Sequence, residues 1–387
     1  MWIKNVRILT EEGIFLPGEI QTEGERIKKV HFTGKQEKPE GEPVMDGNGG
    51  ILFPGMIDMH FHGAAGYDFC DGTMEALGML AKFEASIGVT AICPAAMTLP
   101  KKRTLEILQN AKDFKKHQIE RPDISQADFV GIHMEGPFIS PKKKGAQDEN
   151  FILPCSSDDF FSFQEASGGL VRVIAFAPEE VKGESAREFI RQVGSQAVVA
   201  LAHTDASYDI AKETFEMGAS HAVHLFNAMP ELYHREPGAA GAALDSCEVT
   251  VELICDGVHI HPAVIRLVLA LKKRKVILVS DSMRATGLTD GRYTLGGQDV
   301  EVTGNRAVLV SDGSLAGSVT TLPDCVRYAV KEAGIPLADA LHAATFAPAE
   351  RLGIEKDYGS IREGKFADLV LWDDDLRLKM VIHHGNI

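Results

Sequence analysis

The feature that most constrains the fold of this chain is an alternation between short apolar runs and helix-like stretches through its central part. Eight apolar runs, rich in β-branched residues, occupy positions 55–62, 89–96, 129–138, 171–178, 197–204, 219–227, 248–256 and 275–281. Helix-like stretches at positions 73–86, 101–116, 186–193, 209–217 and 262–273 lie between them. Continuous apolar runs are typical of strands buried on both faces of a parallel sheet. Eight strand–helix units therefore predict an α/β fold, a (β/α)₈ TIM barrel.

A doubly wound open sheet is the alternative fold for the same alternation. That fold often places a Gly-x-Gly-x-x-Gly turn after an early strand, and no such turn follows one here. Eight units also suit closure better than an open sheet, so the barrel is favoured. Helix-like segments at 322–332 and 336–352 follow a glycine-rich stretch, and we expect them to complete the barrel.

Both ends of the chain show a different pattern from the middle, with short β segments and no long helix. These segments are residues 2–9, 18–22, 26–30, 368–372 and 379–383. Because chain termini often lie close together, the two ends are expected to form one domain. We therefore predict a small β-sandwich domain from residues 1–54 and 353–387, beside a catalytic barrel of residues 55–352.

Charge and composition exclude several classes of partner. The 40 basic and 55 acidic residues give a net charge of −15, which argues against nucleic acid or an anionic membrane. An anionic substrate would need a local basic pocket. There is no apolar run of about 18 residues, and residues 1–6 lack the features of a signal peptide, so we predict a cytoplasmic protein. The six cysteines form no Cys-x-x-Cys pair, which indicates free thiols.

Imidazole and carboxylate side chains end several of the predicted strands, where barrel enzymes build their sites. His60 and His62 end the first run, and residues two apart on a strand point to the same side. Glu135 ends the third run within apolar sequence, where an unpaired charge is costly. His203 and His224 end the fifth and sixth runs, one unit apart. A lone histidine at a strand end is usually only a satisfied polar residue, but this convergence predicts a site for Zn, Fe, Co or Mn.

Asp281 ends the eighth run, and its carboxylate can serve in acid–base catalysis rather than in metal binding. A carboxylate facing a metal-bound water can take its proton and pass it to a leaving amine. A metal ion lowers the pKa of bound water from about 15.7 to about 7. Together these parts predict hydrolysis of an amide by metal-bound hydroxide.

Longer motifs resemble a known family of enzymes. Segments 54–62 and 359–370 resemble the amidohydrolase superfamily. More specific motifs resemble, within it, the deacetylases that act on N-acetylglucosamine 6-phosphate; they lie at 133–138, 202–206, 224–230, 235–238, 256–259, 280–281 and 315–317. The resemblance covers nearly the whole chain. It implies hydrolysis of a linear amide, releasing glucosamine 6-phosphate and acetate, in amino-sugar catabolism and cell-wall sugar recycling.

The resemblance also implies which residues hold metal. Glu135, His203 and His224 would bind the main ion, and His60 and His62 would bind a second ion that Glu135 bridges. One or two divalent ions per subunit are expected, most simply zinc or iron, and the presence of both strand-one histidines favours two. Asp281 would act as general base and then as general acid.

Substrate contacts are implied at several further positions. The sugar, its acetyl group or its phosphate would contact Ala146, Gln147, Asn227, Ala228, His259, Leu315, Ala316 and Gly317. Arg235 matches the position of a phosphate-binding arginine that relatives receive from the neighbouring subunit, which implies a homodimer. A guanidinium group binds phosphate oxygens well. It would supply the local positive charge that an anionic substrate needs on a chain with a net charge of −15.

Two departures and two rival functions bear on this interpretation. Gln147 stands where some one-metal relatives have a histidine, which again favours two metals. The fourth run, 171–178, contains no lysine, although relatives with a carboxylated bridging lysine need one there, and this weakens a cyclic-amide substrate. Another amidohydrolase, such as an N-acyl-amino-acid deacylase or a heterocycle aminohydrolase, would share the metal ligands. A non-enzymatic barrel would be expected to have lost some of them.

Overall fold

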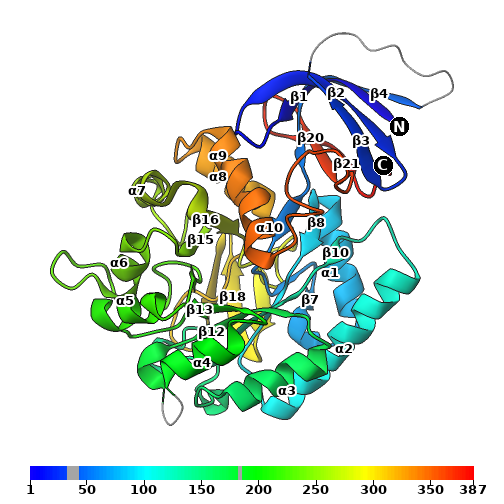
Figure 1. Cartoon of the computed structure of the whole chain (residues 1–387). Coiled ribbons are helices and arrows are strands. Elements are labelled where there is room, and N and C mark those ends of the chain that lie inside the picture. The colour runs from blue at the N-terminus through cyan, green and yellow to red at the C-terminus, as the bar shows by residue number, and fades with distance from the viewer. Residues whose placement is uncertain (33–42, 182–184) are drawn as a thin grey trace.

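The computed structural model describes residues 1–32, 43–181 and 185–387. It shows a β/α barrel with a small sheet domain packed on one end (Figure 1). The barrel strands follow the apolar runs in order: β5 (Met56–Asp58), β8 (Val89–Ile92) with β9 (Ala95–Ala96), β10 (Asp128–Phe129) with β11 (Ile132–Phe138), β12 (Val171–Phe176), β13 (Val198–Leu201), β14 (His221–Ala222), β15 (Thr250–Ile254) and β16 (Val276–Val279). The predicted fold class is confirmed.

Hydrogen bonding arranges these strands as a closed parallel wall. One sheet has the order β10-β8-β5 and the other β16-β15-β14-β13-β12-β11-β9. Backbone hydrogen bonds connect the segments that follow the first and last barrel strands. The Asp281 N–H donates to the His60 carbonyl at 3.0 Å. The His62 N–H likewise donates to the Ser282 carbonyl at 2.7 Å. The carboxyl ends of the first and eighth strands therefore lie side by side.

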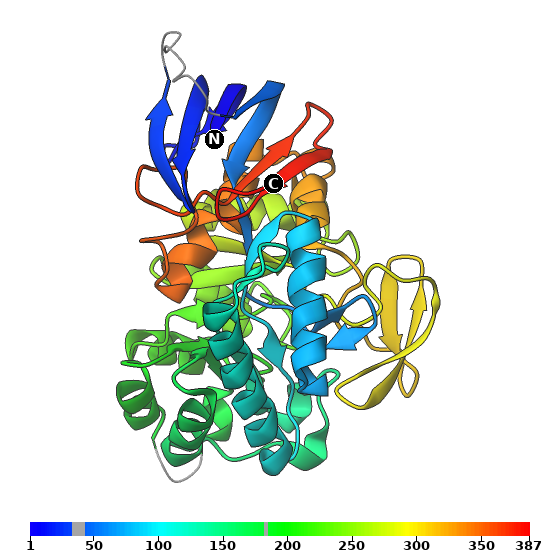
Figure 2. The same cartoon turned by 90° about the vertical axis from the view of Figure 1, so that its right-hand side faces the viewer.

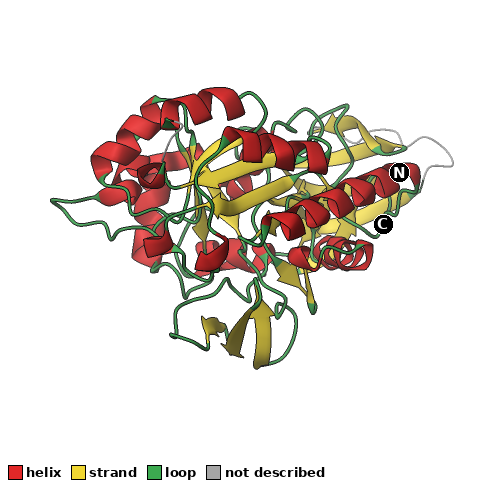
Figure 3. Cartoon of the chain, turned by 90° about the horizontal axis from the view of Figure 1, so that it is seen from below, coloured by secondary structure: helices red, strands yellow, loops and turns green. Residues whose placement is uncertain are grey.

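Helices cover the outside of the barrel (Figure 3). They are α1 (Met74–Ser86), α2 (Lys101–Glu120), α3 (Ser157–Ser167), α4 (Ala186–Val193), α5 (Tyr208–Glu216), α6 (Gly238–Asp245), α7 (Pro262–Lys272), α8 (Leu322–Lys331), α9 (Leu337–Ala344) and α10 (Phe346–Leu352). Side-chain caps fix several starts, as where the Thr73 hydroxyl accepts from the Ala76 N–H. Helices α3 and α6 were not predicted. Six of the eight residues of α6 are small and buried, so it has no polar stripe to reveal it.

The two ends of the chain meet in one six-stranded sheet. Its order is β21-β20-β4-β1-β2-β3, from β1 (Trp2–Leu9), β2 (Phe15–Glu23), β3 (Arg26–His31), β4 (Val44–Pro54), β20 (Leu369–Trp372) and β21 (Leu378–Ile382). Figure 2 shows this sheet above the barrel, with both termini in it. After Gly55, β4 continues directly into β5. A side chain at Gly55 would clash, because a Cβ there would lie 2.0 Å from the Thr90 hydroxyl oxygen.

A three-stranded antiparallel sheet, which lies between the last barrel strand β16 and the closing helices α8 to α10, was not predicted. It comprises β17 (Gly291–Leu295), β18 (Gln298–Thr303) and β19 (Arg306–Leu309), and it projects from the barrel in Figure 2. A smaller hairpin, β6 (Gly63–Ala64) and β7 (Tyr67–Asp68), follows the first barrel strand. The apolar side of the three-stranded sheet packs with Met97, Met283 and Ala316. This packing holds the segment around Ala316 beside the mouth of the barrel.

Two simpler expectations can also be compared with the structure. All six cysteines are free thiols, as predicted; Cys247 is exposed, Cys70 is half-buried and the other four are buried. Within the described ranges, no helix is long and apolar enough to cross a membrane.

Candidate active site

The predicted metal ligands converge at the carboxyl ends of the barrel strands. The Glu135 carboxylate lies at the centre: its Oε1 is 2.9 Å from His203 Nε2 and 3.2 Å from His224 Nε2. On its other side, His62 Nε2 is 3.4 Å from Oε2 and His60 Nε2 is 3.7 Å from Oε1. All five side chains are buried. The carboxylate thus lies between two pairs of imidazoles, each pair forming with it a group able to hold an ion.

The backbone at three strand ends has an unusual conformation. His203, His224 and Asp281 have φ angles of 44°, 30° and 50°. Residues other than glycine seldom adopt this left-handed region, which costs about 1–3 kcal/mol and persists where surrounding contacts enforce it. At Asp281 the contacts include the backbone bond to His60 described above. Strain of this kind at three converging residues is typical of a functional site.

Hydrogen bonds on the outer sides of the rings turn the inner ring nitrogens toward Glu135, and in the neutral rings these nitrogens carry no proton. The Nδ1–H of His203 donates to the Lys143 carbonyl at 2.9 Å, so the neutral ring has an unprotonated Nε2. The Nδ1–H of His60 donates to the Glu252 carboxylate at 2.8 Å, with the same result. A lone pair and a carboxylate oxygen repel each other unless a cation or proton lies between them. Among the described residues, His60 Nε2 and Asp281 Oδ1 have no hydrogen-bond partner. This donor set fits a divalent metal ion.

The pKa values of the buried groups in the cluster also indicate that it favours a bound positive charge. Burial opposes protonation of His60, yet Glu252, Asp281 and Glu135 raise its pKa to about 10. Burial opposes ionisation of Glu135, but the surrounding imidazoles hold its pKa well below the usual value. For Asp281, burial is likewise outweighed by the nearby imidazoles of His62 and His60, so the pKa is lowered. Both carboxylates are therefore ionised at neutral pH, and a bound metal would displace the extra proton of His60.

A second layer of buried polar groups, which the sequence reasoning missed, orients these ligands. Glu252 on β15 is fully buried. Its Oε2 accepts from His60 Nδ1 and, at 3.1 Å, from the backbone N–H of His224, while its Oε1 lies 2.8 Å from His221 Nε2. Second-layer contacts of this kind fix ring orientation. The signal was present, because Glu252 is a carboxylate in the interior of an apolar run, as Glu135 is.

We expect Glu252→Gln to weaken zinc binding by about 10- to 100-fold, because an amide cannot accept hydrogen bonds through both of its polar atoms. Competition with a fluorescent zinc chelator would measure this change. Glu84→Gln is the matched control: Glu84 is also buried, in α1, and burial together with Asp58 raises its pKa well above the usual value, so glutamine resembles its neutral form. Equal zinc affinity in the Glu252 variant and the native chain would contradict the expected role.

A cavity of 280 Å³ opens onto the cluster and gathers most of the predicted substrate contacts. Its lining includes Ala146, Gln147, Asn227, Ala228, His259, Leu315 and Gly317, together with Asp281 and four of the five predicted ligands. Ala316 is not among the lining residues, because its side chain is fully buried under the three-stranded sheet. Arg235 also does not line the cavity. It is exposed and lies in the segment between β14 and α6.

Two cavity residues have defined partners. The Gln147 amide nitrogen donates to Glu135 Oε2 at 2.6 Å, and its oxygen accepts from the Thr98 N–H at 2.6 Å. Gln147 therefore orients the central carboxylate. His259 Nδ1 lies 2.7 Å from Asp256 Oδ2. Burial opposes protonation of His259, but this carboxylate outweighs burial and raises the pKa of the ring. The Asp256 carboxylate therefore favours the protonated form of the His259 ring.

Comparison with known proteins identifies the family. The sequence model of the amidohydrolase family matches residues 51–387. The chain is 36% identical to the N-acetylglucosamine-6-phosphate deacetylase of Bacillus subtilis (strain 168), over 100% of this chain and 96% of the relative. It is 33% identical to the N-acetylgalactosamine-6-phosphate deacetylase of Escherichia coli O157:H7, over 98% and 97% of the two chains.

Solved structures agree with these matches. The structure of N-acetyl-D-glucosamine-6-phosphate deacetylase from Mycobacterium smegmatis, a mutant in complex with N-acetyl-D-glucosamine-6-phosphate, superposes with a TM-score of 0.91 at 29% identity, covering 100% of this chain and 98% of the other. That of the N-acetylglucosamine-6-phosphate deacetylase from Thermotoga maritima gives 0.87 at 32% identity, covering 100% and 99%. On the extent of these matches, this chain is a hydrolase that belongs to the amidohydrolase family.

Proposed function

We propose that this hydrolase removes the acetyl group of N-acetylglucosamine 6-phosphate, releasing glucosamine 6-phosphate and acetate. The observation that carries the proposal is the convergence, in one cavity, of Asp281, the imidazole–carboxylate cluster and the residues expected to bind the sugar. The relatives described above act on acetylated amino-sugar phosphates, as their names say. The reaction would serve amino-sugar catabolism and cell-wall sugar recycling in the cytoplasm.

The metal part of the proposal uses two groups of ligands. Glu135, His203 and His224 would hold the main divalent ion, zinc or iron, and His60 and His62, together with Glu135, would hold a second ion. When bound, such ions lower the pKa of a water and polarise a carbonyl oxygen. The Gln147 amide keeps Glu135 in place by donating to its Oε2. This assigns to Gln147 an orienting role, rather than the polarising role of a histidine at that position.

Asp281 would move the proton. Its Oδ1 lacks a hydrogen-bond partner among the described residues and lies 3.2 Å from His62 Nε2, at the edge of the cavity. An ionised carboxylate there can take a proton from the attacking water. It can then deliver that proton to the amide nitrogen as the carbon–nitrogen bond breaks, so that the sugar leaves as an amine. One residue thus acts as base and then as acid.

The sugar and its phosphate would contact further residues that line the cavity. The His259 ring, whose protonated form Asp256 favours, would suit the phosphate or a sugar hydroxyl. Asn227 and Ala228 follow the strand-end His224 and would face the sugar, while Leu315 and Gly317 would cover the acetyl group. Ala316 would act indirectly, by packing beneath these two residues. Arg235 would reach the phosphate in the neighbouring subunit of a homodimer, which is consistent with its exposure.

Arg235→Ala should raise KM for the phosphorylated sugar by about 10- to 100-fold, because a charge-assisted hydrogen bond contributes about 1.5–3 kcal/mol. Its effect on unphosphorylated N-acetylglucosamine should be small. Steady-state kinetics with both substrates would measure the difference. Arg191→Ala, which removes an exposed arginine from α4, is the matched control. Equal changes in KM for both sugars would remove the phosphate role.

Acetate release from three substrates would test the function as a whole. Purified metal-loaded protein would be given N-acetylglucosamine 6-phosphate, N-acetylgalactosamine 6-phosphate and an N-acetyl amino acid. We expect the highest kcat/KM with the first. The second compound is included because one relative at 33% identity is named for it. Faster turnover of the N-acetyl amino acid, or no acetate from either sugar phosphate, would refute the proposal.

A further inference from the structure

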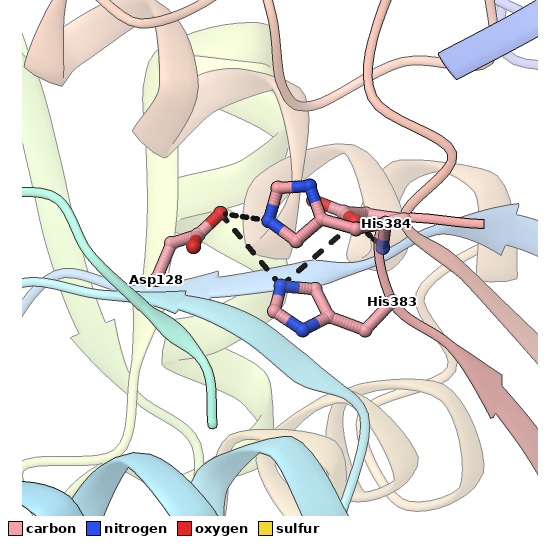
Figure 4. A group of neighbouring side chains, drawn as sticks. Asp128, His383 and His384 are labelled. Carbon is pink, nitrogen blue, oxygen red and sulfur yellow. Dashed lines mark hydrogen bonds and ion pairs between the residues drawn. The ribbon is translucent and has the colours of Figure 1, made fainter. Parts of the chain in front are cut away.

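Four titratable side chains gather where the barrel meets the sheet domain, apart from the candidate active site. Asp128 begins β10, at the amino-terminal end of a barrel strand. Asp368 directly precedes β20, and His383 and His384 directly follow β21. Figure 4 shows both imidazoles beside the Asp128 carboxylate. We call these four residues the junction cluster. It joins two parts of the chain that lie more than two hundred residues apart.

The distances within the junction cluster suit a common ligand. His384 Nε2 is 2.9 Å from Asp128 Oδ2. His383 Nε2 is 3.7 Å from the same oxygen and 3.9 Å from Asp368 Oδ1. Each residue offers one nitrogen or oxygen, and these four atoms all lie within 4.8 Å of one another.

The cluster also contains buried polar atoms that protein groups leave unsatisfied. The Nδ1–H of His383 donates to the Ile124 carbonyl at 3.1 Å, so the neutral ring has a bare Nε2. In the part of the chain that the structure describes, this Nε2 and Asp368 Oδ2 have no hydrogen-bond partner. His383 is 4% exposed and Asp368 is 6% exposed. A bare nitrogen and two carboxylates share this buried space, which favours an added positive charge.

Surrounding groups already hold these side chains in place. The Tyr358 O–H donates to Asp128 Oδ2 at 2.8 Å, and the His384 N–H donates to Asp368 Oδ1 at 2.8 Å. Contacts of this type orient the ligands of natural metal sites. A cavity of 350 Å³ adjoins the cluster and is lined by Asp128, Tyr358 and both histidines. The cavity offers an ion a route to the cluster from the surface.

We propose that Asp128, Asp368, His383 and His384 bind a zinc ion that ties the sheet domain to the base of the barrel. Two imidazoles and two carboxylates supply the four ligands of a closed, tetrahedral structural site, with no position left for a substrate. Imidazole ligands favour zinc over magnesium or calcium. The cluster lies at the amino-terminal face of the barrel, where residues serve stability rather than catalysis. It shares no residue with the candidate active site.

Metal analysis of two variants tests the proposal. The first variant leaves the junction cluster intact, and the second changes one of its residues. In a chain carrying Glu135→Gln, His203→Asn and His224→Asn, the ligands of the main active-site ion are removed. After equilibration with zinc and removal of free metal, elemental analysis should still find one tightly bound zinc per chain. Adding His383→Gln to that chain should remove this zinc. A chain that has lost its active-site ligands and retains no zinc would overturn the proposal.

A single substitution in the otherwise native chain gives a second, independent result. His383→Gln should lower the zinc content by one ion per chain and lower Tm, while acetate release by the remaining metal-loaded enzyme is retained. His117→Gln, on the exposed face of α2, is the matched control and should change neither quantity. Unchanged zinc content in the His383 variant would overturn the proposal. A lower Tm with unchanged zinc would do so too, since it would indicate an ion-pair cluster without metal.

Discussion

Replacing Asp281 with asparagine should lower kcat for acetate release by about 10²- to 10⁴-fold, the usual contribution of a positioned acid–base group. Asparagine has nearly the same shape but cannot take or return a proton. The carboxylate it replaces is ionised, lies at the edge of the cavity and has an unpaired Oδ1 among the described residues. Kinetics measured with parallel metal analysis would separate loss of the proton carrier from loss of the ion.

Two comparisons make this result interpretable. Asp205→Asn is the matched control, because Asp205 also lies just after the carboxyl end of a barrel strand but does not line the cavity. It should keep most of the native activity. A loss of less than about 10-fold in the Asp281 variant with its metal retained would contradict the assigned proton transfer.

Removal of bound metal should reduce turnover by about 10³-fold or more, since a metal ion supplies several kcal/mol of transition-state stabilisation. Without it, His60 holds a proton, because the surrounding carboxylates outweigh burial and raise its pKa to about 10. Dialysis against a chelator, followed by the acetate assay, would measure the loss. Adding zinc or cobalt back should restore activity.

The control is a mock dialysis without chelator, which should leave turnover unchanged. Full activity in a preparation that elemental analysis shows to be free of metal would refute the metal-dependent mechanism. Protein that stays inactive after zinc is restored, but regains its native Tm, would also count against it.

Much of the fold could be predicted because its strands are buried on both faces. Strand β16 is entirely apolar and entirely buried, so its run is visible in the sequence without any other information. The three-stranded sheet was missed for the opposite reason. In β18 only Val300 and Val302 are buried, between exposed polar residues, and the glycine-rich turns on either side have the appearance of a loop. Helix α6 was missed because its small residues are buried on nearly all sides.

The part of the candidate site that could be predicted consists of residues at the carboxyl ends of successive barrel strands. Ligands that end parallel strands share one rim, so His203 and His224 could be paired from sequence alone. Contacts that depend on the register between strands could not be found this way. The bonds of Glu252 to two neighbouring histidines are of this kind. Arg235 stays a prediction, because its proposed target lies in another subunit.

The position of β4 in its sheet has a consequence for how this protein is made. Strand β4 lies between β1 and β20, so one of its edges is completed only by residues 369–372. At a synthesis rate of about 5–20 residues per second, that edge emerges from the ribosome roughly 15–60 s before its partner. Open strand edges recruit other chains. The nascent polypeptide is therefore most vulnerable to aggregation before its last strands appear, and it should depend on chaperones during that interval.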